Sequence, residues 1–234
     1  LRLSTEVYMN LKKILSEKGL STTVGDEGGF APNLRTNEEV IEHIIQAVEV
    51  SGMRYGEDIH LGLDCAATEF FQDGTYVLKG ENKQLSSLEM IDYLKDLINK
   101  FQIISVEDPL DENDWDSWAK ITAECPNTQI VGDDIFVTQS KLLDRGIKEN
   151  AGNAILVKLN QVGSLSETLE AINLAQNNNF STVISHRSGE TEDSFISDLS
   201  VAVNAKQIKT GAPARSDRTA KYNRLLIINS ELYP

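Results

Sequence analysis

Six short, mostly apolar runs rich in β-branched residues recur along the chain, and most of them stop at a polar residue. They lie at residues 59–63, 103–106, 129–132, 154–157, 181–185 and 207–208. Such runs are typical of strands that are buried on both faces of a parallel sheet. A helical stretch follows nearly every run. The pattern therefore predicts repeated βα units, in which the carboxyl ends of the strands meet on one face.

Helix and turn signals support this interpretation. Apolar residues at helical spacing predict a helix over residues 1–18. Asp73 and Gly74 predict a tight hairpin within residues 70–78. Ser86 and Glu89 have the spacing of a capping box, which predicts a helix start. Further helices are expected after Asn37, after Ser164, over residues 192–205 and over residues 219–229.

Composition narrows the class of protein. With 234 residues and 40% hydrophobic content, the chain is long and apolar enough for one large α/β domain over residues 1–234. The net charge of −14 argues against nucleic acids and anionic membranes as partners. No apolar run approaches the roughly 20 residues of a membrane span. Cys65 and Cys125 lack a CxxC spacing, and no signal peptide precedes them, so a reducing cytoplasm is expected.

The beginning of the sequence is unusual. Leu1 is not an initiator methionine, and residues 1–18 already read as a helix in progress. We therefore expect the chain to be a segment that was cut at its N-terminus.

Three acids stand at or near the ends of three predicted strands. Asp64, Glu107 and Asp133 each begin a loop, so their carboxylates should converge. Carboxylate oxygens are the ligands that Mg²⁺ prefers, and converging carboxylates would repel one another without a cation. The pattern favours a Mg²⁺ site. Helix capping is the alternative for each acid, and zinc is disfavoured because the acids lack a His/Cys cluster.

Basic residues end three later strands. Lys158 follows an apolar strand, where it could serve as a general base or form an ion pair with nearby acids. His186, Arg187 and Ser188 follow the next strand, and Lys209 follows the last. His186, Arg187, Ser188 and Lys209 together offer the groups of a pocket for a phosphorylated or carboxylated small molecule.

Glu27 lies in a loop that is rich in glycine. Gly25, Gly28 and Gly29 flank it, and such a loop can carry a carboxyl group into a pocket and let it move. The alternative is a surface glutamate in an ordinary turn.

Seven motifs in succession resemble those of the enolase family. They are Gly25–Pro32, Leu63–Ala66, Val106–Pro109, Gly132–Asp134, Val157–Gly163, Ser185–Thr191 and Ile208–Pro213. They come in the family's order and cover the chain from its first helix to its C-terminus.

The resemblance implies a Mg²⁺-dependent lyase that interconverts 2-phosphoglycerate with phosphoenolpyruvate and water in glycolysis and gluconeogenesis. Asp64, Glu107 and Asp133 match the metal ligands of the family, Lys158 matches the base, and Glu27 matches the acid that helps hydroxide leave. The residues that match the substrate-holding groups are His186, Arg187, Ser188 and Lys209.

The resemblance also implies a fold with parts missing. The family barrel is a TIM-type ββαα(βα)₆ barrel. Residues 1–234 would supply six of its eight strands, without the N-terminal domain and the first two barrel strands. Glu27 would then lie on the loop between two helices.

Two other interpretations stay open. One is a related superfamily enzyme that acts on a different carboxylate. The other is a non-catalytic surface-binding or structural role. The family's usual homodimer, or a higher homo-oligomer, is expected for the full-length protein. The expected location is the cytoplasm, with display at the cell surface or secretion as an additional location.

Overall fold

The computed structural model of the chain describes residues 1–233 and divides into two compact units. Unit 1 joins Leu1–Ile59 with Ile184–Pro234, and unit 2 is the continuous segment His60–Val183. One domain over residues 1–234 stays a prediction.

Unit 2 is built on parallel strands. They are β1 (Gly62–Asp64), β5 (Ser105–Glu107), β6 (Gln129–Gly132) and β7 (Ala154–Val157). β1 pairs in parallel with β5, β5 with β6, and β6 with β7. The six-stranded sheet has the order β1-β5-β6-β7-β8-β9, in which β8 is Ser181–Ser185 and β9 is Lys206–Lys209. These strands follow one another in the sheet as they do in the sequence, which confirms the predicted succession of βα units.

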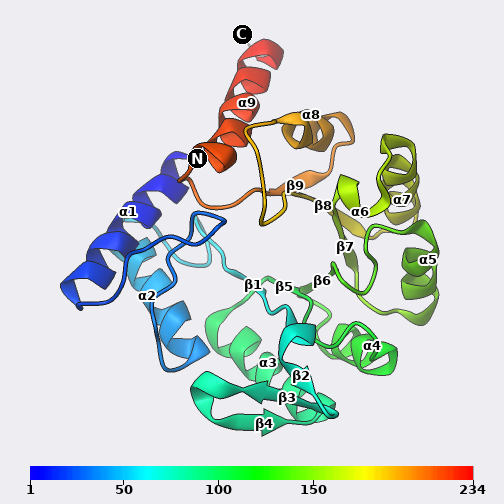
Figure 1. Cartoon of the computed structure of the whole chain (residues 1–234), viewed down its shortest axis with the longest axis horizontal. Helices are drawn as coiled ribbons and strands as arrows, with labels where there is room; N and C mark the ends of the chain where they lie inside the picture. Colours follow the sequence, from blue (N-terminus) through cyan, green and yellow to red (C-terminus); the bar gives the residue numbers. More distant parts are fainter. Residues whose placement is uncertain (234) are drawn as a thin grey trace. The chain divides into compact units, whose positions relative to one another are not determined.

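Helices connect these strands. They are α3 (Ser87–Phe101), α4 (Trp115–Glu124), α5 (Ser140–Glu149), α6 (Leu159–Val162) and α7 (Leu165–Asn177). In Figure 1, α3, α4, α5 and α7 lie along one side of the unit 2 strands. Their apolar faces are buried, as Ile91 and Leu94 of α3 illustrate. On the strands, Ile155 and Leu156 of β7 are completely buried, as expected for a parallel sheet.

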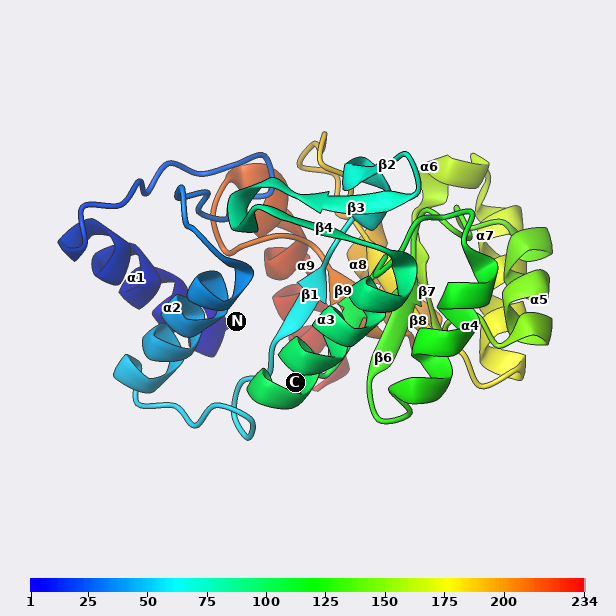
Figure 2. The same cartoon turned by 90° about the horizontal axis from the view of Figure 1, so that it is seen from below.

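A small antiparallel sheet follows β1. It contains β2 (Phe71–Gln72), β3 (Thr75–Leu78) and β4 (Lys83–Leu85), with short 3₁₀ turns at Ala67–Phe70 and Lys79–Glu81. Asp73 and Gly74 form the predicted tight turn with φ of 49° and 81°, the left-handed values that a two-residue hairpin requires. In Figure 2 this sheet and α6 lie at the same end of unit 2, to which the parallel strands point.

Unit 1 is assembled from both ends of the chain. It contains α1 (Arg2–Glu17), α2 (Asn37–Val50), α8 (Phe195–Ala202), β9 (Lys206–Lys209) and α9 (Ser216–Leu232). β8 (Ser181–Ser185) begins in unit 2 and ends in unit 1. α1 packs on α2 through buried residues such as Leu15 and Val48, and α8 packs on α9.

The strand boundaries differ from those that the apolar runs predict. β1 begins at Gly62 rather than at Ile59, and β5 begins at Ser105 rather than at Ile103. Parallel pairing of β1 with β5 sets these limits, since Gly62 aligns with Ser105 and Asp64 with Glu107. Asp64 and Glu107 are therefore the last residues of their strands.

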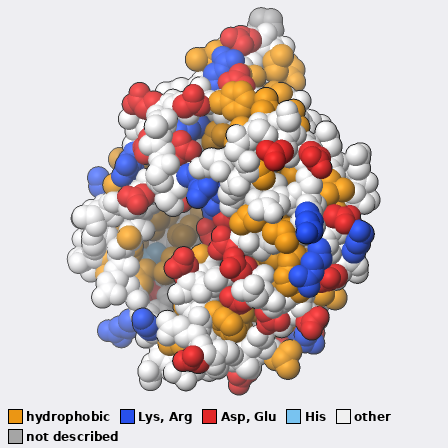
Figure 3. Space-filling view, turned by 45° about the vertical axis from the view of Figure 1, so that its right-hand side comes forward, with side chains coloured by type: hydrophobic (Ala, Val, Ile, Leu, Met, Phe, Trp, Pro, Cys, Tyr) orange, Lys and Arg blue, Asp and Glu red, His pale blue; other side chains and the backbone are white. Residues whose placement is uncertain are grey.

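The surface carries both signs of charge. On the face drawn in Figure 3, acidic and basic side chains lie beside one another with apolar side chains among them. The chain as a whole has 36 acidic and 22 basic residues. Within residues 1–233, the helices are all too short or too polar to cross a bilayer.

Candidate active site

The predicted metal ligands lie at the carboxyl ends of neighbouring strands in unit 2. Asp64 ends β1 and Glu107 ends β5, and the two residues are paired in register. Asp133 follows β6 directly, and β6 pairs with β5. The backbone thus places all three acids on one edge of the sheet, as the sequence predicts.

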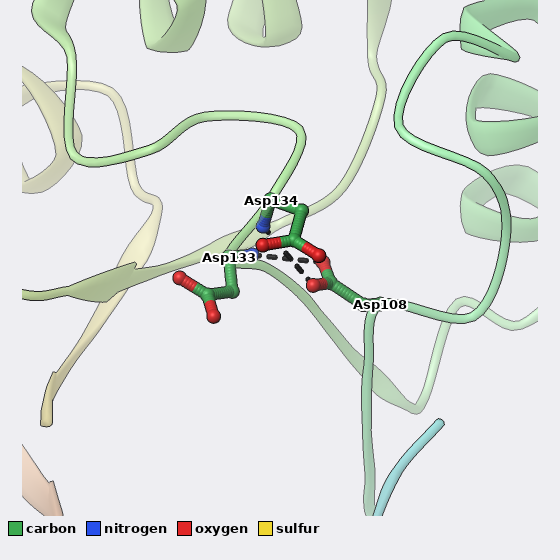
Figure 4. A group of neighbouring side chains, drawn as sticks. All are labelled: Asp108, Asp133 and Asp134. Atoms are coloured by element: carbon green, nitrogen blue, oxygen red, sulfur yellow. Dashed lines mark hydrogen bonds between the residues drawn. The ribbon is translucent and has the colours of Figure 1, made fainter. Parts of the chain in front are cut away.

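The carboxylates that lie closest together form a different set. Asp108, Asp133 and Asp134 offer oxygen atoms that all lie within 4.8 Å of one another. The Asp108 carboxylate accepts hydrogen bonds from the backbone N–H groups of Asp133 (2.9 Å) and Asp134 (3.0 Å). In Figure 4 the Asp133 carboxylate is turned away from the other two. Asp108 therefore braces the strand end that positions Asp133.

The two neighbouring acids, Asp108 and Asp134, are residues that sequence reasoning passed over. The signal for them was present in the sequence, since each stands next to a predicted ligand in an acidic doublet. Their grouping with Asp133 depends on side-chain directions, which spacing along a sequence does not fix. The assignment of Asp64, Glu107 and Asp133 as the ligands stays a prediction.

Acidic groups are concentrated at this edge. Burial and then the charges of Asp133 and Asp134 raise the pKa of Asp108 to about 8, against the opposing effect of its backbone hydrogen bonds. Burial, Asp133 and the more distant Asp64 also raise the pKa of Asp134, although Lys158 opposes this. A hard cation with carboxylate ligands would relieve the repulsion. The donor set at this edge therefore fits a divalent metal.

Lys158 supplies one positive charge to the same edge. It follows β7 and stands at the N-cap of α6. Its Nζ forms an ion pair with the Asp133 carboxylate, and its side chain is only 16% exposed. Gln161 donates to the other Asp133 oxygen at 2.9 Å. The ion pair that the sequence left as an alternative to a general base is thus present in the structure.

A second group of predicted residues gathers in unit 1. The Glu27 loop, between α1 and α2, is held against the chain after β9 by a hydrogen bond of 2.9 Å from Ala212 N to Glu27 O. Gly28 has a φ of +81°, and a Cβ there would lie 2.8 Å from Ala214 O. A side chain at this position would push the loop away, so Gly28 permits the close approach.

Glu27 lies beside the residues that end β8. Its carboxylate is 3.2 Å from His186 Nε2, off the direction of a hydrogen bond, and it accepts a hydrogen bond of 3.4 Å from Ser188 Oγ. Interaction with His186 lowers the pKa of Glu27 to about 2, with smaller contributions from the charges of Lys209 and Arg218. Glu27 is therefore ionised at neutral pH.

The remaining predicted anion-binding residues belong to the same group. His186 N donates to Lys209 O at 3.0 Å, which joins the ends of β8 and β9. Arg187 N donates to the Glu190 carboxylate at 3.1 Å, which folds back the loop after β8. Unit 1 thus brings together Glu27, His186, Ser188 and Lys209, and Arg187 lies between two of them in sequence.

Arg218 also belongs to this group, although sequence reasoning missed it. Its guanidinium is completely buried and hydrogen-bonds to His186 and to backbone carbonyl groups around Glu27 and Ser188. A lone arginine near a helix start has no distinctive pattern in a sequence. Only the fold shows that it lies among the predicted residues.

Comparison with known proteins gives two findings. Residues 1–233 match the sequence model of a family described as "Enolase, C-terminal TIM barrel domain". The whole chain is 54% identical, over 234 residues, to a protein named enolase from Natranaerobius thermophilus, of which it covers 55%. The chain thus spans about half the length of this curated relative. The match also confirms the predicted fold class, a partial TIM-type barrel.

Proposed function

We propose that the protein is a phosphopyruvate hydratase, because this chain belongs to the enolase family. The reaction is the reversible loss of water from 2-phosphoglycerate to give phosphoenolpyruvate. The observation that carries the proposal is the 54% identity over the entire chain. The grouping of acids with Lys158 in unit 2, and of Glu27 with basic residues in unit 1, supports it.

We assign the metal site to Asp64, Glu107 and Asp133, with Mg²⁺ as the ion. The donors are carboxylates, two of them less than 10% exposed, which suits a hard divalent cation better than zinc. A bound Mg²⁺ would neutralise the negative charge that accumulates on the substrate carboxylate when its neighbouring proton is removed.

Lys158 is the proposed base that removes the proton from C2 of the substrate. In the structure its Nζ is paired with the Asp133 carboxylate. Because Asp133 is also a proposed metal ligand, a bound metal would compete with Lys158 for this carboxylate.

Glu27 is the proposed acid that protonates the departing hydroxyl group at C3. In the structure its pKa is about 2, so it is ionised before substrate arrives. A substrate that carries a phosphate and a carboxylate brings negative charge, which favours the protonated form of a neighbouring carboxyl group. Proton uptake by Glu27 on substrate binding is thus part of the proposal.

The substrate-holding groups are His186, Arg187, Ser188 and Lys209. Arginine presents a planar fork that matches phosphate, and lysine places a point charge beside a carboxylate. The arginine and lysine side chains would hold the phosphate and the carboxylate of the substrate while Lys158 and Glu27 act on its carbon chain.

The decisive experiment compares Lys158→Ala with Glu27→Gln in the protein as its gene encodes it. Lys158→Ala should abolish exchange of the C2 proton with solvent, because the base is gone. Glu27→Gln should preserve this exchange and block net dehydration, because only the second step needs the acid. Isotope exchange followed by NMR gives the first rate, and phosphoenolpyruvate absorbance gives the second. Equal loss of exchange in both variants would show that the roles are wrongly divided.

We also propose that the protein forms a homo-oligomer and is located in the cytoplasm. Light scattering and cell fractionation of the native protein test these two points. A native protein that binds a surface ligand and lacks hydratase activity would instead support the non-catalytic interpretation.

A further inference from the structure

Arg218 makes four short contacts with its buried guanidinium. Nη1 contacts His186 Nδ1 at 2.5 Å and donates to Arg187 O at 2.6 Å. Nη2 donates to Asp26 O at 2.9 Å and to Ser188 O at 2.6 Å. One side chain thus joins the loop that carries Glu27 to the loop after β8.

The position of Arg218 is unfavourable for the helix to which it belongs. It lies in the first turn of α9, where the partial positive charge of the helix end repels a cation. Its side chain is also 0% exposed, and a buried charge is costly unless it is well paired. Asp217 offers only a distant contact, 3.7 Å from Nε. The three carbonyl groups and His186 are therefore its main partners.

The chemistry of arginine determines the form of His186. A guanidinium has five N–H donors, no acceptor, and no accessible neutral form. The imidazole nitrogen that faces it must therefore accept the hydrogen bond and carry no proton. An imidazolium ring would place two donors against each other over 2.5 Å. The ring proton must then be on Nε2, the nitrogen that faces Glu27 at 3.2 Å.

We propose that Arg218 is a positioning residue that fixes His186 as the neutral Nε2–H tautomer and holds Glu27 and Ser188 in place around it. His186 then acts as a hydrogen-bond donor through Nε2 and is unable to act as a general acid from Nδ1. The tautomer follows from the contacts alone, whereas its catalytic consequence rests on the proposed function.

The close packing around Arg218 supports a preformed arrangement. A Cβ at Gly211 would lie 2.8 Å from Arg218 Cδ and 2.7 Å from Glu27 O. Gly211 also has a φ of +84°, which side chains rarely adopt. The guanidinium therefore has little freedom to leave His186.

His43 provides an internal reference with the opposite tautomer. Its Nδ1 lies 2.6 Å from Glu39 O, an acceptor, so Nδ1 carries the proton. Its Nε2 faces Lys18 Nζ at 3.0 Å, and an ammonium only donates. A single spectrum can therefore compare both tautomers in one protein.

The test is a ¹⁵N–¹H correlation spectrum of the histidine rings in the native protein at neutral pH. We expect His186 to show a proton on Nε2 only, and His43 to show one on Nδ1 only. A proton on Nδ1 of His186, alone or with one on Nε2, would overturn the proposal without any variant.

Variants then assign the effect to Arg218. Arg218→Met should remove the single tautomer of His186 and lower kcat by about 100-fold, because small displacements of reacting groups have effects of this size. Arg218→Lys keeps a cation that only donates hydrogen bonds, so the His186 tautomer should be unchanged. This variant still tests the proposal if Arg218→Met does not fold. It should still lose activity, because one ammonium cannot serve four acceptors.

Lys221→Met is the matched control. Lys221 is also a buried cation of α9, 1% exposed, but it donates to Glu190 and to the Thr191 and Asp217 carbonyl groups instead. Its loss should leave the His186 tautomer unchanged. A tautomer that changes equally in Lys221→Met and Arg218→Met would show a general packing effect and contradict the proposal.

Failure of the proposed function can be distinguished from failure of this inference. If the native protein lacks turnover, the proposed function fails, while the spectrum still decides the tautomer.

Discussion

Single neighbours contact the two groups proposed to move protons. Lys158 forms an ion pair with Asp133, and contact with His186 lowers the pKa of Glu27. Glu27 is therefore ionised, which is the form opposite to the one in which it is proposed to protonate the hydroxyl group.

The low pKa of Glu27 predicts a pH-dependent contribution to stability. The folded value of about 2 lies below the ordinary value of 4.5, so folding favours the ionised form. The contribution is complete above pH 4.5 and is lost as the pH falls towards 2. Glu27→Gln should therefore lower the thermal midpoint most at neutral pH, with a difference that narrows below about pH 4.5.

The size of this difference should be small, because the Glu27 side chain is 43% exposed and solvent screens its charge. Scanning calorimetry from pH 7 downward measures it. Glu42→Gln, at an exposed position in the middle of α2 within the same unit, serves as a control variant. A difference that widens on acidification would contradict the lowered pKa of Glu27.

At the scale of elements, the sequence predicts which segments are strands better than where they begin. The apolar run at residues 59–63 gives β1, but pairing with β5 moves the strand to Gly62–Asp64. β4, with the polar sequence Lys83-Gln84-Leu85, was missed because antiparallel pairing with β3 creates it. Local patterns determine helices with good caps, whereas partners distant in sequence determine strand limits.

The capping box of α3 is a prediction that the structure confirms. Ser86 N donates to the Glu89 carboxylate at 2.8 Å, and Glu89 N donates to Ser86 Oγ at 3.4 Å. Ser86→Ala should lower the free energy of unfolding by about 1 kcal/mol. For a protein of this size this corresponds to a fall of about 2–4 °C in Tm.

A double-mutant cycle with Glu89→Ala measures the reciprocity of the box. The loss in the double variant should be smaller than the sum of the two single losses, because each single change already breaks the shared contact. Strict additivity in thermal unfolding would show that the two side chains act independently.

At the scale of the whole molecule, the resemblance assigns a role to each candidate site residue, which pattern alone would not do, and these roles stay predictions. Spacing placed Asp64, Glu107 and Asp133 on one sheet edge, which pairing confirms. It could not show that Asp108 and Asp134 group with Asp133, nor that Arg218 reaches Asp26. Those contacts depend on side-chain direction and on chain segments that are far apart.

Expression of residues 1–234 alone provides a test of the partial barrel. β1 and β9 stand at the two ends of the sheet order, and β1 is largely exposed. Unpaired strand edges promote association. We expect the isolated segment to self-associate and to show no hydratase turnover, whatever its site residues. Size-exclusion chromatography with light scattering, followed by an activity assay, checks this. Monodisperse and active material would refute the expectation.

The contact between Arg218 and Asp26 also has a consequence for the order of folding. The two residues are 192 positions apart. At synthesis rates of roughly 5–20 residues per second, Asp26 is added to the chain roughly ten to forty seconds before Arg218. In refolding the complete chain is present, but so large a separation in sequence makes the contact slow to form. The Ala212 amide, which bonds to Glu27 O, should therefore be among the last to gain protection in pulsed hydrogen exchange during refolding, and early protection there would refute this order. The proposed acid would then be set in place only when α9 docks.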